Sequence, residues 1–276
     1  MTRSALAELR PALLAVWASF LCEWQEVGRK KVRWLAVLVN VALLLIPLLL
    51  AQLAFGSEGF AASGGGEHVA AFIAVGWLAM QVAQQTLLGA QGYLRWGNET
   101  GVLPHLWTTR VARWVPVVGI TLFELAEMLV WTVVILVVVL LAAGGFPAVS
   151  LLSIPVILLS LIGFSGIGLA MGGAGLVLRQ WRVPGLINGV MFLMAGAAFP
   201  IAVLPAEVRW LSYGLPHTYA LDAMRHTLLG TPTLIPLWVE LIILSLTAVI
   251  GAVGGVAVFN RLDRYATRRG LVGLYT

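Results

Sequence analysis

Long apolar runs alternate with short polar segments along most of the chain. A membrane-spanning helix needs about 20 mostly apolar residues, and six runs reach or approach that length. The pattern therefore predicts six transmembrane helices, at 34–55, 69–92, 114–143, 149–178, 186–204 and 237–259. The third and fourth runs are about 30 residues long, which at about 1.5 Å per residue lets them tilt in the bilayer or protrude from it.

The segment before the first expected span, residues 4–31, has an amphipathic pattern. Its apolar side chains recur every three or four positions, which places them on one face of a helix. Because the fully apolar part is too short to cross a bilayer, we expect a helix that lies in the membrane interface. A signal peptide is the alternative, but no small-x-small cleavage site follows, and Glu23, Glu26 and a basic cluster do.

Residues 96–110 separate the second and third expected spans and combine charges with a few large apolar side chains. Leu103, Leu106 and Trp107 form a small apolar face that a plain connecting loop would not need. We expect a short helix here, with Pro104 in its first turn, where the missing N–H costs little. An interfacial turn without a partner is the alternative.

The segment before the last expected span is apolar but broken by prolines, at positions 200, 205, 216, 232 and 236. Proline interrupts continuous helix, and irregular backbone at membrane depth must be covered by protein or line a cavity. We therefore expect two short helices over 205–230 that dip back into the membrane. Leu221, Met224 and Leu228 share one face, and Asp222 is spaced to pair with Arg225. A surface loop is the alternative.

Composition and charge support a membrane protein with a defined orientation. Of the 276 residues 60% are hydrophobic and 11% are charged, whereas soluble domains carry about 25% charged residues. With the six spans above, all lysines and arginines except Arg209 and Arg225 fall on one side, which predicts cytoplasmic N- and C-termini. The arginines flank spans and do not form one patch, so no nucleic-acid partner is expected.

Two carboxylates in the third expected span are the clearest candidates for a substrate pathway. Glu124 and Glu127 share one helix face, and a carboxylate at that depth is costly unless it is protonated, paired or hydrated. Gln84 and Gln85 in the second span are placed to face them. A purely structural hydrogen-bond cluster and a cavity-lining role both remain open.

The sequence contains no convergent catalytic set. Its four histidines are scattered, Cys22 is the only cysteine, and neither lysine lies in a glycine-rich phosphate loop. We therefore expect no metal and no cofactor on this chain, and a separate subunit wherever ATP is used.

Two stretches carry a family resemblance. One is Glu99-Thr100-Gly101-Val102-Leu103-Pro104, followed by Leu106, Thr108 and Thr109; the other contains "AFPIAVLP" and "LPHTYALDAMRHTLLG". On these motifs and their order, the chain resembles the permease subunits of type-2 ABC exporters over nearly its whole length. Val102, Pro104 and Arg110 depart from the family's pattern.

The resemblance implies an all-α polytopic fold with an interface helix, six spans, a coupling helix over 96–110 and re-entrant outer helices. It implies a dimer of permeases, homodimeric or with a related permease, and two ATPase subunits that bind ATP and Mg. The residues assigned to ATPase coupling are Glu99, Gly101, Leu103, Leu106 and Trp107. Those assigned to an outer gate are Phe199, Pro200, Leu204 and Pro205, and Phe199 joins Glu124, Glu127, Gln84 and Gln85 in the substrate pathway.

The resemblance implies ATP-driven export, because related permeases export drugs, lipids and lipid-linked glycans. The apolar spans, which lack a charged path, favour an amphiphilic or hydrophobic compound as the substrate. A secondary transporter or channel without ATP is the main alternative. It would be favoured by an internal repeat or by charges in several spans, and neither is evident. A membrane-embedded enzyme lacks a catalytic set.

Overall fold

The computed structural model describes residues 13–22, 24–25, 39, 69–109, 111–142, 150–178, 189–191, 193–197 and 199–271. Every regular element in these ranges is helical. They are α4 (Val69–Glu99), α5 (Val102–Leu106), α6 (Trp114–Ala142), α7 (Ser153–Leu178), η1 (Ile201–Val203), α9 (Ala206–Tyr213), α10 (Pro216–Leu229) and α11 (Leu237–Arg268). Within α4, α6, α7 and α11 are stretches long and apolar enough to cross a membrane. The chain is therefore an all-α, multi-pass membrane protein.

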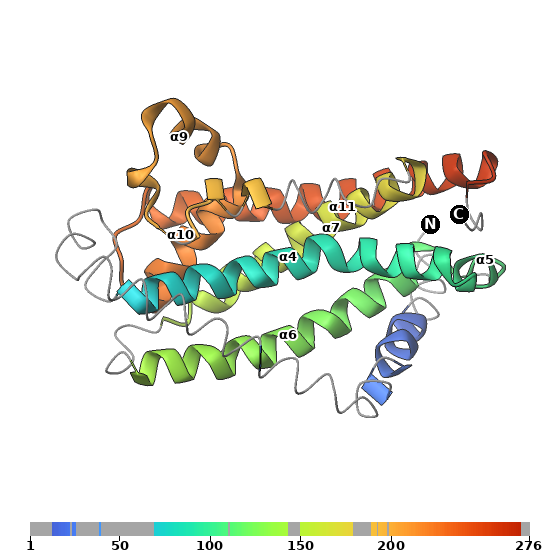
Figure 1. Ribbon diagram of the computed structural model, residues 1–276, viewed down its shortest axis with the longest axis horizontal. Coiled ribbons are helices and arrows are strands. Elements are labelled where there is room, and N and C mark those ends of the chain that lie inside the picture. The colour runs from blue at the N-terminus through green and yellow to red at the C-terminus, as the bar shows by residue number, and fades with distance from the viewer. Residues whose placement is uncertain are drawn as a thin grey trace, which may run out of the picture.

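The four long helices run along the longest axis of the molecule (Figure 1). α5 lies at one end of this bundle and α9 at the other, and we call these ends the α5 end and the α9 end. α4, α7 and α11 run toward the α5 end, whereas α6 runs away from it. Both ends of the bundle therefore carry short helices that join the long ones.

Prolines mark where many of the helices begin. Pro116 and Pro155 lie in the first turns of α6 and α7, Pro216 is the first residue of α10, and Pro205 and Pro236 immediately precede α9 and α11. The first turn tolerates proline because its backbone N–H groups have no partner within the helix. The prolines therefore divide the apolar sequence into separate helices without weakening them.

Several helix ends differ from the ranges expected from hydropathy. α4 continues to Glu99 and α11 to Arg268, beyond the expected ends at 92 and 259. Polar side chains end an apolar run but do not end a helix, and in α4 they support it, because Arg95 and Glu99 form an i,i+4 ion pair at 2.8 Å.

The fifth expected span, 186–204, does not remain helical to its expected end. Its described part is helical at 189–191 and 193–194, and the chain then turns at Gly196, which has a φ of 74°. A short 3-10 helix, η1, follows Pro200. The first expected span, 34–55, lies outside the described residues except for Val39.

α7 is the central helix and packs closely on both α11 and α4. A Cβ atom added to Gly166 would overlap the backbone of Gly251, and one added to Gly255 would overlap the carbonyl of Gly166. On the other side of α7, a Cβ on Gly168 would overlap the carbonyl of Thr86 in α4. Small residues allow membrane helices to approach this closely, which increases their van der Waals contact.

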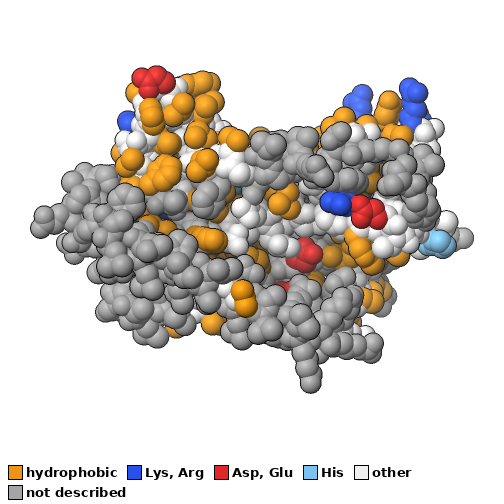
Figure 2. All heavy atoms as spheres, viewed as in Figure 1, with side chains coloured by type: hydrophobic (Ala, Val, Ile, Leu, Met, Phe, Trp, Pro, Cys, Tyr) orange, Lys and Arg blue, Asp and Glu red, His pale blue; other side chains and the backbone are white. Residues whose placement is uncertain are grey.

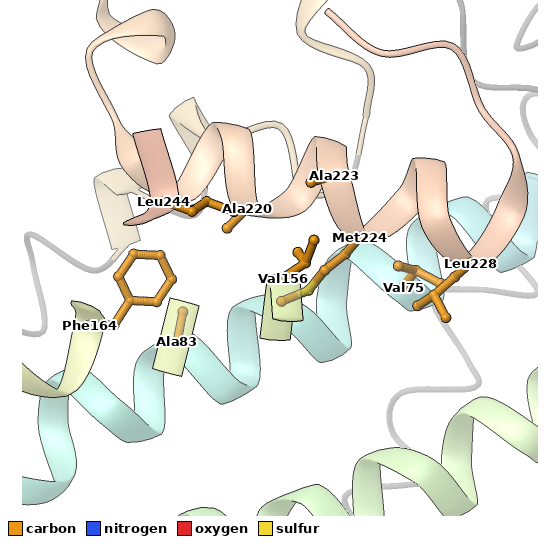
Figure 3. Packing of buried hydrophobic residues seen from close by; sticks show 9 residues of the cluster. All are labelled: Val75, Ala83, Val156, Phe164, Ala220, Ala223, Met224, Leu228 and Leu244. Atoms are coloured by element: carbon orange, nitrogen blue, oxygen red, sulfur yellow. The ribbon is translucent and has the colours of Figure 1, made fainter. Parts of the chain in front are cut away.

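α10 is held against the bundle by an apolar cluster (Figure 3). Met224 and Leu228 of α10 meet Val75 of α4, Val156 of α7 and Leu244 of α11. The face expected from the sequence, formed by Leu221, Met224 and Leu228, is buried along its whole length. A helix too short to span is thus packed as tightly as the long helices around it.

Helical residues 13–22 lie beside α6 near its start (Figure 1). The ring of Phe20 packs edge-on against Phe123 with 5.3 Å between centroids, and a Cβ on Gly119 would lie 2.8 Å from the carbonyl oxygen of Val16. Trp17 and Trp24 are exposed. The rest of the expected helix over 4–31 lies outside the described residues, apart from 24–25.

Candidate functional site

The connection between α4 and α6 at the α5 end begins with a tight turn. Gly101 adopts a left-handed conformation with a φ of 74°, which glycine accepts without strain. α5 starts at the next residue, and the Nδ1 atom of His105 lies 2.9 Å from the carbonyl oxygen of Gly101. Glu99 pairs with Arg95, and no side chain caps α5. The helix expected over 96–110 is therefore two pieces, the end of α4 and the five residues of α5.

The three apolar residues expected to form one exposed face have different environments. Leu103 is 1% exposed and packs against Leu94 and Phe259, inside the chain. Trp107 packs against the apolar cluster that contains Leu103 and Phe259, and the guanidinium of Arg113 lies 4.7 Å from the centre of its ring. Leu103 is therefore fixed inside the chain, whereas Trp107 is half-buried and packs against the bundle with only part of its ring.

A different set of α5 side chains is accessible. Val102 is 37% exposed, His105 is exposed and Leu106 is half-buried. Their i, i+3 and i+4 spacing places them on one side of the helix. We call these three residues the α5 surface. The apolar contact indicated by the sequence stays a prediction; within it Leu103 is buried, Leu106 and Trp107 are half-buried, and the neighbouring Val102 is exposed.

One predicted pair in the long helices is brought together. The Nε2 group of Gln85 in α4 donates a hydrogen bond of 2.8 Å to the carboxylate of Glu124 in α6. Gly89 makes room for this carboxylate, because a Cβ there would lie 2.5 Å from its Oε2 atom. Gln84 and Glu127 are half-buried on the same two helices. A polar contact is thus built into the interface between α4 and α6.

At the α9 end, Arg225 of α10 binds backbone carbonyls far away in the sequence. It donates to Gly196 at 2.9 Å, to Ala197 at 2.7 Å and to Phe72 at 3.3 Å, and its guanidinium lies 3.5 Å from the centre of the Phe72 ring. The guanidinium is enclosed by these backbone and ring contacts. It joins α10, the turn at 196–197 and the start of α4.

The expected pairing of Asp222 with Arg225 does not form. A carboxylate oxygen of Asp222 accepts a hydrogen bond of 2.6 Å from the backbone N–H of Leu234. The i,i+3 spacing allowed the pair, but the irregular backbone around residue 196 leaves carbonyls that need donors, and Arg225 supplies them.

The predicted gate residues bracket η1. Pro200 and Leu204 are buried, Phe199 is half-buried and Pro205 is exposed where α9 begins. Arg209 donates hydrogen bonds to the carbonyls around η1, at 2.7 Å to Ala202 and 2.8 Å to Leu204.

Sequence reasoning missed this role of Arg209 and Arg225. The available signal was that the only two arginines on this side of the expected topology accompany its proline-broken segment.

A cavity of about 190 Å³ lies between η1, α10 and the segment before α11. Pro200 lines it on one side, and its polar lining consists of Thr218, Asp222, Arg225, Thr231 and Thr233. Of the predicted gate residues, Pro200 therefore borders a cavity whose lining is mostly apolar with several polar groups. Among the residues that the structure describes, no group of three or more acidic, cysteine or histidine side chains could hold a metal ion.

A model of the protein family described as "ABC-2 type transporter" matches residues 16–229. The matched range begins in the N-terminal helical segment, includes α4, α5, α6 and α7, and ends with the last residue of α10. Comparison with curated proteins gives no match.

Proposed function

Because the chain belongs to the ABC-2 type transporter family, as a multi-pass permease that works with an ATPase, we propose that it exports an amphiphilic or hydrophobic compound across the cytoplasmic membrane. In this proposal six spans hold both termini in the cytoplasm, and the α5 end faces the ATPase. Two permeases, identical or related, assemble with two ATPase subunits, which bind ATP and Mg.

The position of α5 is the observation that carries this proposal. α5 lies at the end of the bundle, between the end of α4 and the start of α6 (Figure 1). Leu103 and Trp107 fix it to the bundle, while Val102, His105 and Leu106 are left accessible. A short helix fixed on one side and accessible on the other can transmit a push from a soluble partner to the long helices. Gly101 forms the turn before α5, and Glu99 belongs to the last helical turn of α4.

The described long helices support an amphiphilic or hydrophobic substrate. Their surfaces are dominated by aliphatic side chains, and the bond between Gln85 and Glu124 places a polar group between α4 and α6. Such a surface suits a molecule with a long apolar part and a small polar group. Glu127, Gln84 and Phe199 are assigned to the same pathway, and Phe199, Pro200, Leu204 and Pro205 to its outer gate.

Copurification and reconstitution test the function directly. The full-length chain, expressed with an ATPase of the same cell, should retain that subunit through purification. In proteoliposomes it should move a candidate drug, lipid or lipid-linked glycan only with ATP and Mg, and the true substrate should stimulate hydrolysis. Transport driven by an ion gradient without ATP would instead identify a secondary transporter.

Replacing Glu124→Gln is expected to reduce substrate-stimulated ATP hydrolysis about tenfold while the complex still assembles. The amide keeps the size of the side chain but removes its charge, and hydrogen bonds to charged groups contribute about 1.5–3 kcal/mol. The measurement is the stimulated rate in proteoliposomes over a range of substrate concentrations. Glu207→Gln, on the exposed first turn of α9, is the matched control. Unchanged kinetics in the Glu124 variant would assign the bond with Gln85 to structure alone.

A further inference from the structure

A basic hollow of about 540 Å³ lies between α6 and α11 at the α5 end. Its lining includes Arg113 and Trp114 at the start of α6, and Asn260, Asp263, Arg264 and Arg268 on α11. Figure 2 shows basic side chains over the part of the molecule where α11 ends. Apart from Arg113, which lies over the Trp107 ring, these residues take no part in the ATPase contact or the substrate pathway described above.

The charges that line this basic hollow are unequal. Arg113 donates a 2.9 Å bond to the carboxylate of Asp263 and a 2.8 Å bond to the hydroxyl of Thr267, so Asp263 is neutralised within the protein. Asp263 is also shielded, with 5% of its side chain exposed. Arg264 and Arg268 are exposed and lie one helical turn apart. They give the hollow an excess of two positive charges.

The length of α11 indicates where the basic hollow lies relative to the membrane. The hydrocarbon core of a bilayer is about 30 Å thick. Trp238 at the start of α11 is 65% exposed, as expected for a tryptophan at the membrane interface. At about 1.5 Å per residue, Asn260 lies about 33 Å further along the helix. Asn260, Arg264 and Arg268 therefore lie in and beyond the opposite headgroup layer, on the same side as Trp114.

We propose that the basic hollow binds the phosphate group of an anionic phospholipid, with Arg264 and Arg268 contacting the phosphate oxygens. Basic pockets between transmembrane helices on the cytoplasmic side are suited to anionic headgroups. The depth favours a lipid over a soluble phosphate, because the acyl chains can lie along the exposed apolar surface of α11. The assignment to the cytoplasmic leaflet rests on the function proposed above. A bound lipid lies between the end of α11, which holds its phosphate, and the start of α6, which lines the same hollow.

The test compares two double variants of the full-length chain that remove the same charge from the same helix end. Arg264→Gln with Arg268→Gln changes the hollow. Arg261→Gln with Arg269→Gln is the control, since neither residue lines the hollow and the guanidinium of Arg269 lies 5.5 Å from the centre of the Tyr265 ring. Each chain is placed in nanodiscs of phosphatidylcholine with increasing phosphatidylglycerol, and retained phosphatidylglycerol is counted by native mass spectrometry.

In the hollow variant, retention of phosphatidylglycerol is expected to be about 30-fold weaker, because each arginine contributes roughly a fivefold effect. In the control variant, retention is expected to weaken less than about threefold, because its charges are screened by salt. Equal losses in both variants would overturn the site, because they would reflect surface charge alone. Displacement of the lipid by millimolar inorganic phosphate would also overturn it, in favour of a soluble anion.

The assay is independent of the proposed function, because it needs neither ATP nor the ATPase. A chain that retains the lipid but captures no ATPase would contradict the proposed function and support the lipid site. A hollow variant that loses ATPase capture but keeps its lipid would overturn the lipid site and assign the arginines to subunit docking. Equal thermal unfolding of both variants by circular dichroism excludes misfolding as the cause.

Discussion

A leucine at Gly166 is expected to separate α11 from α7 and to prevent the folded chain from accumulating in the membrane. The new Cβ would overlap the backbone of Gly251, and no side-chain rotation can relieve that contact. Gly251 and Gly255 approach α7 just as closely, so the strain cannot be absorbed by a small shift along the helix. Overpacking a core costs typically 1–3 kcal/mol, and a backbone overlap should exceed that range.

The yield of monodisperse protein in detergent and its midpoint of thermal unfolding measure this effect. Gly254→Leu is the matched control, because it lies on α11 within the same glycine-rich stretch and a Cβ there meets nothing within 4 Å. The control should be obtained in near wild-type yield. Equal losses from Gly166→Leu and Gly254→Leu would show that the glycines are not packing contacts.

Placing aspartate at both Val102 and Leu106 is expected to release the ATPase and to abolish ATP-driven transport. Both residues belong to the α5 surface, whereas Leu103 and Trp107 hold the turn in place. Large apolar contacts at an interface can contribute about 2 kcal/mol or more each, so losing two should weaken capture by about a thousandfold. The long helices should remain folded, because neither side chain belongs to the buried core.

Pull-down of the ATPase, together with transport in proteoliposomes, is the measurement. Val203→Asp with Leu211→Asp adds the same charges at exposed positions of the α9 end and should leave capture intact. Leu103→Ala should differ from both by lowering the thermal stability of the chain, since it removes a buried side chain. Wild-type capture and transport in the Val102 and Leu106 double variant would contradict the coupling role of α5.

The helical character of the chain could be predicted because it depends on local properties. Apolar runs of about 20 residues have few alternatives to helix in a membrane. The prolines before residues 206, 217 and 237 divide the next stretch into α9, α10 and α11. Helix ends were harder to predict, since the ion pair of Arg95 and Glu99 extends α4 beyond its apolar part.

The partners of individual side chains could not be predicted in the same way. Periodicity places Leu103, Leu106 and Trp107 near one another. It does not show which of them pack inside the chain, because that depends on contacts with Phe259 of α11. Arg225 is a similar case, because its acceptors are 28, 29 and 153 positions away in the sequence. Only the assembled bundle brings those carbonyls to the guanidinium.

The three carbonyls bound by Arg225 also set an order for biogenesis. Phe72 leaves the ribosome long before α10 is made, and Gly196 and Ala197 emerge shortly before it. Until all three acceptors are in place, a cationic side chain would be costly to bury and must stay near the lipid headgroups. We therefore expect α10 to dock late in maturation, and a chain truncated before residue 216 to show a loosened, protease-sensitive turn at 196–197.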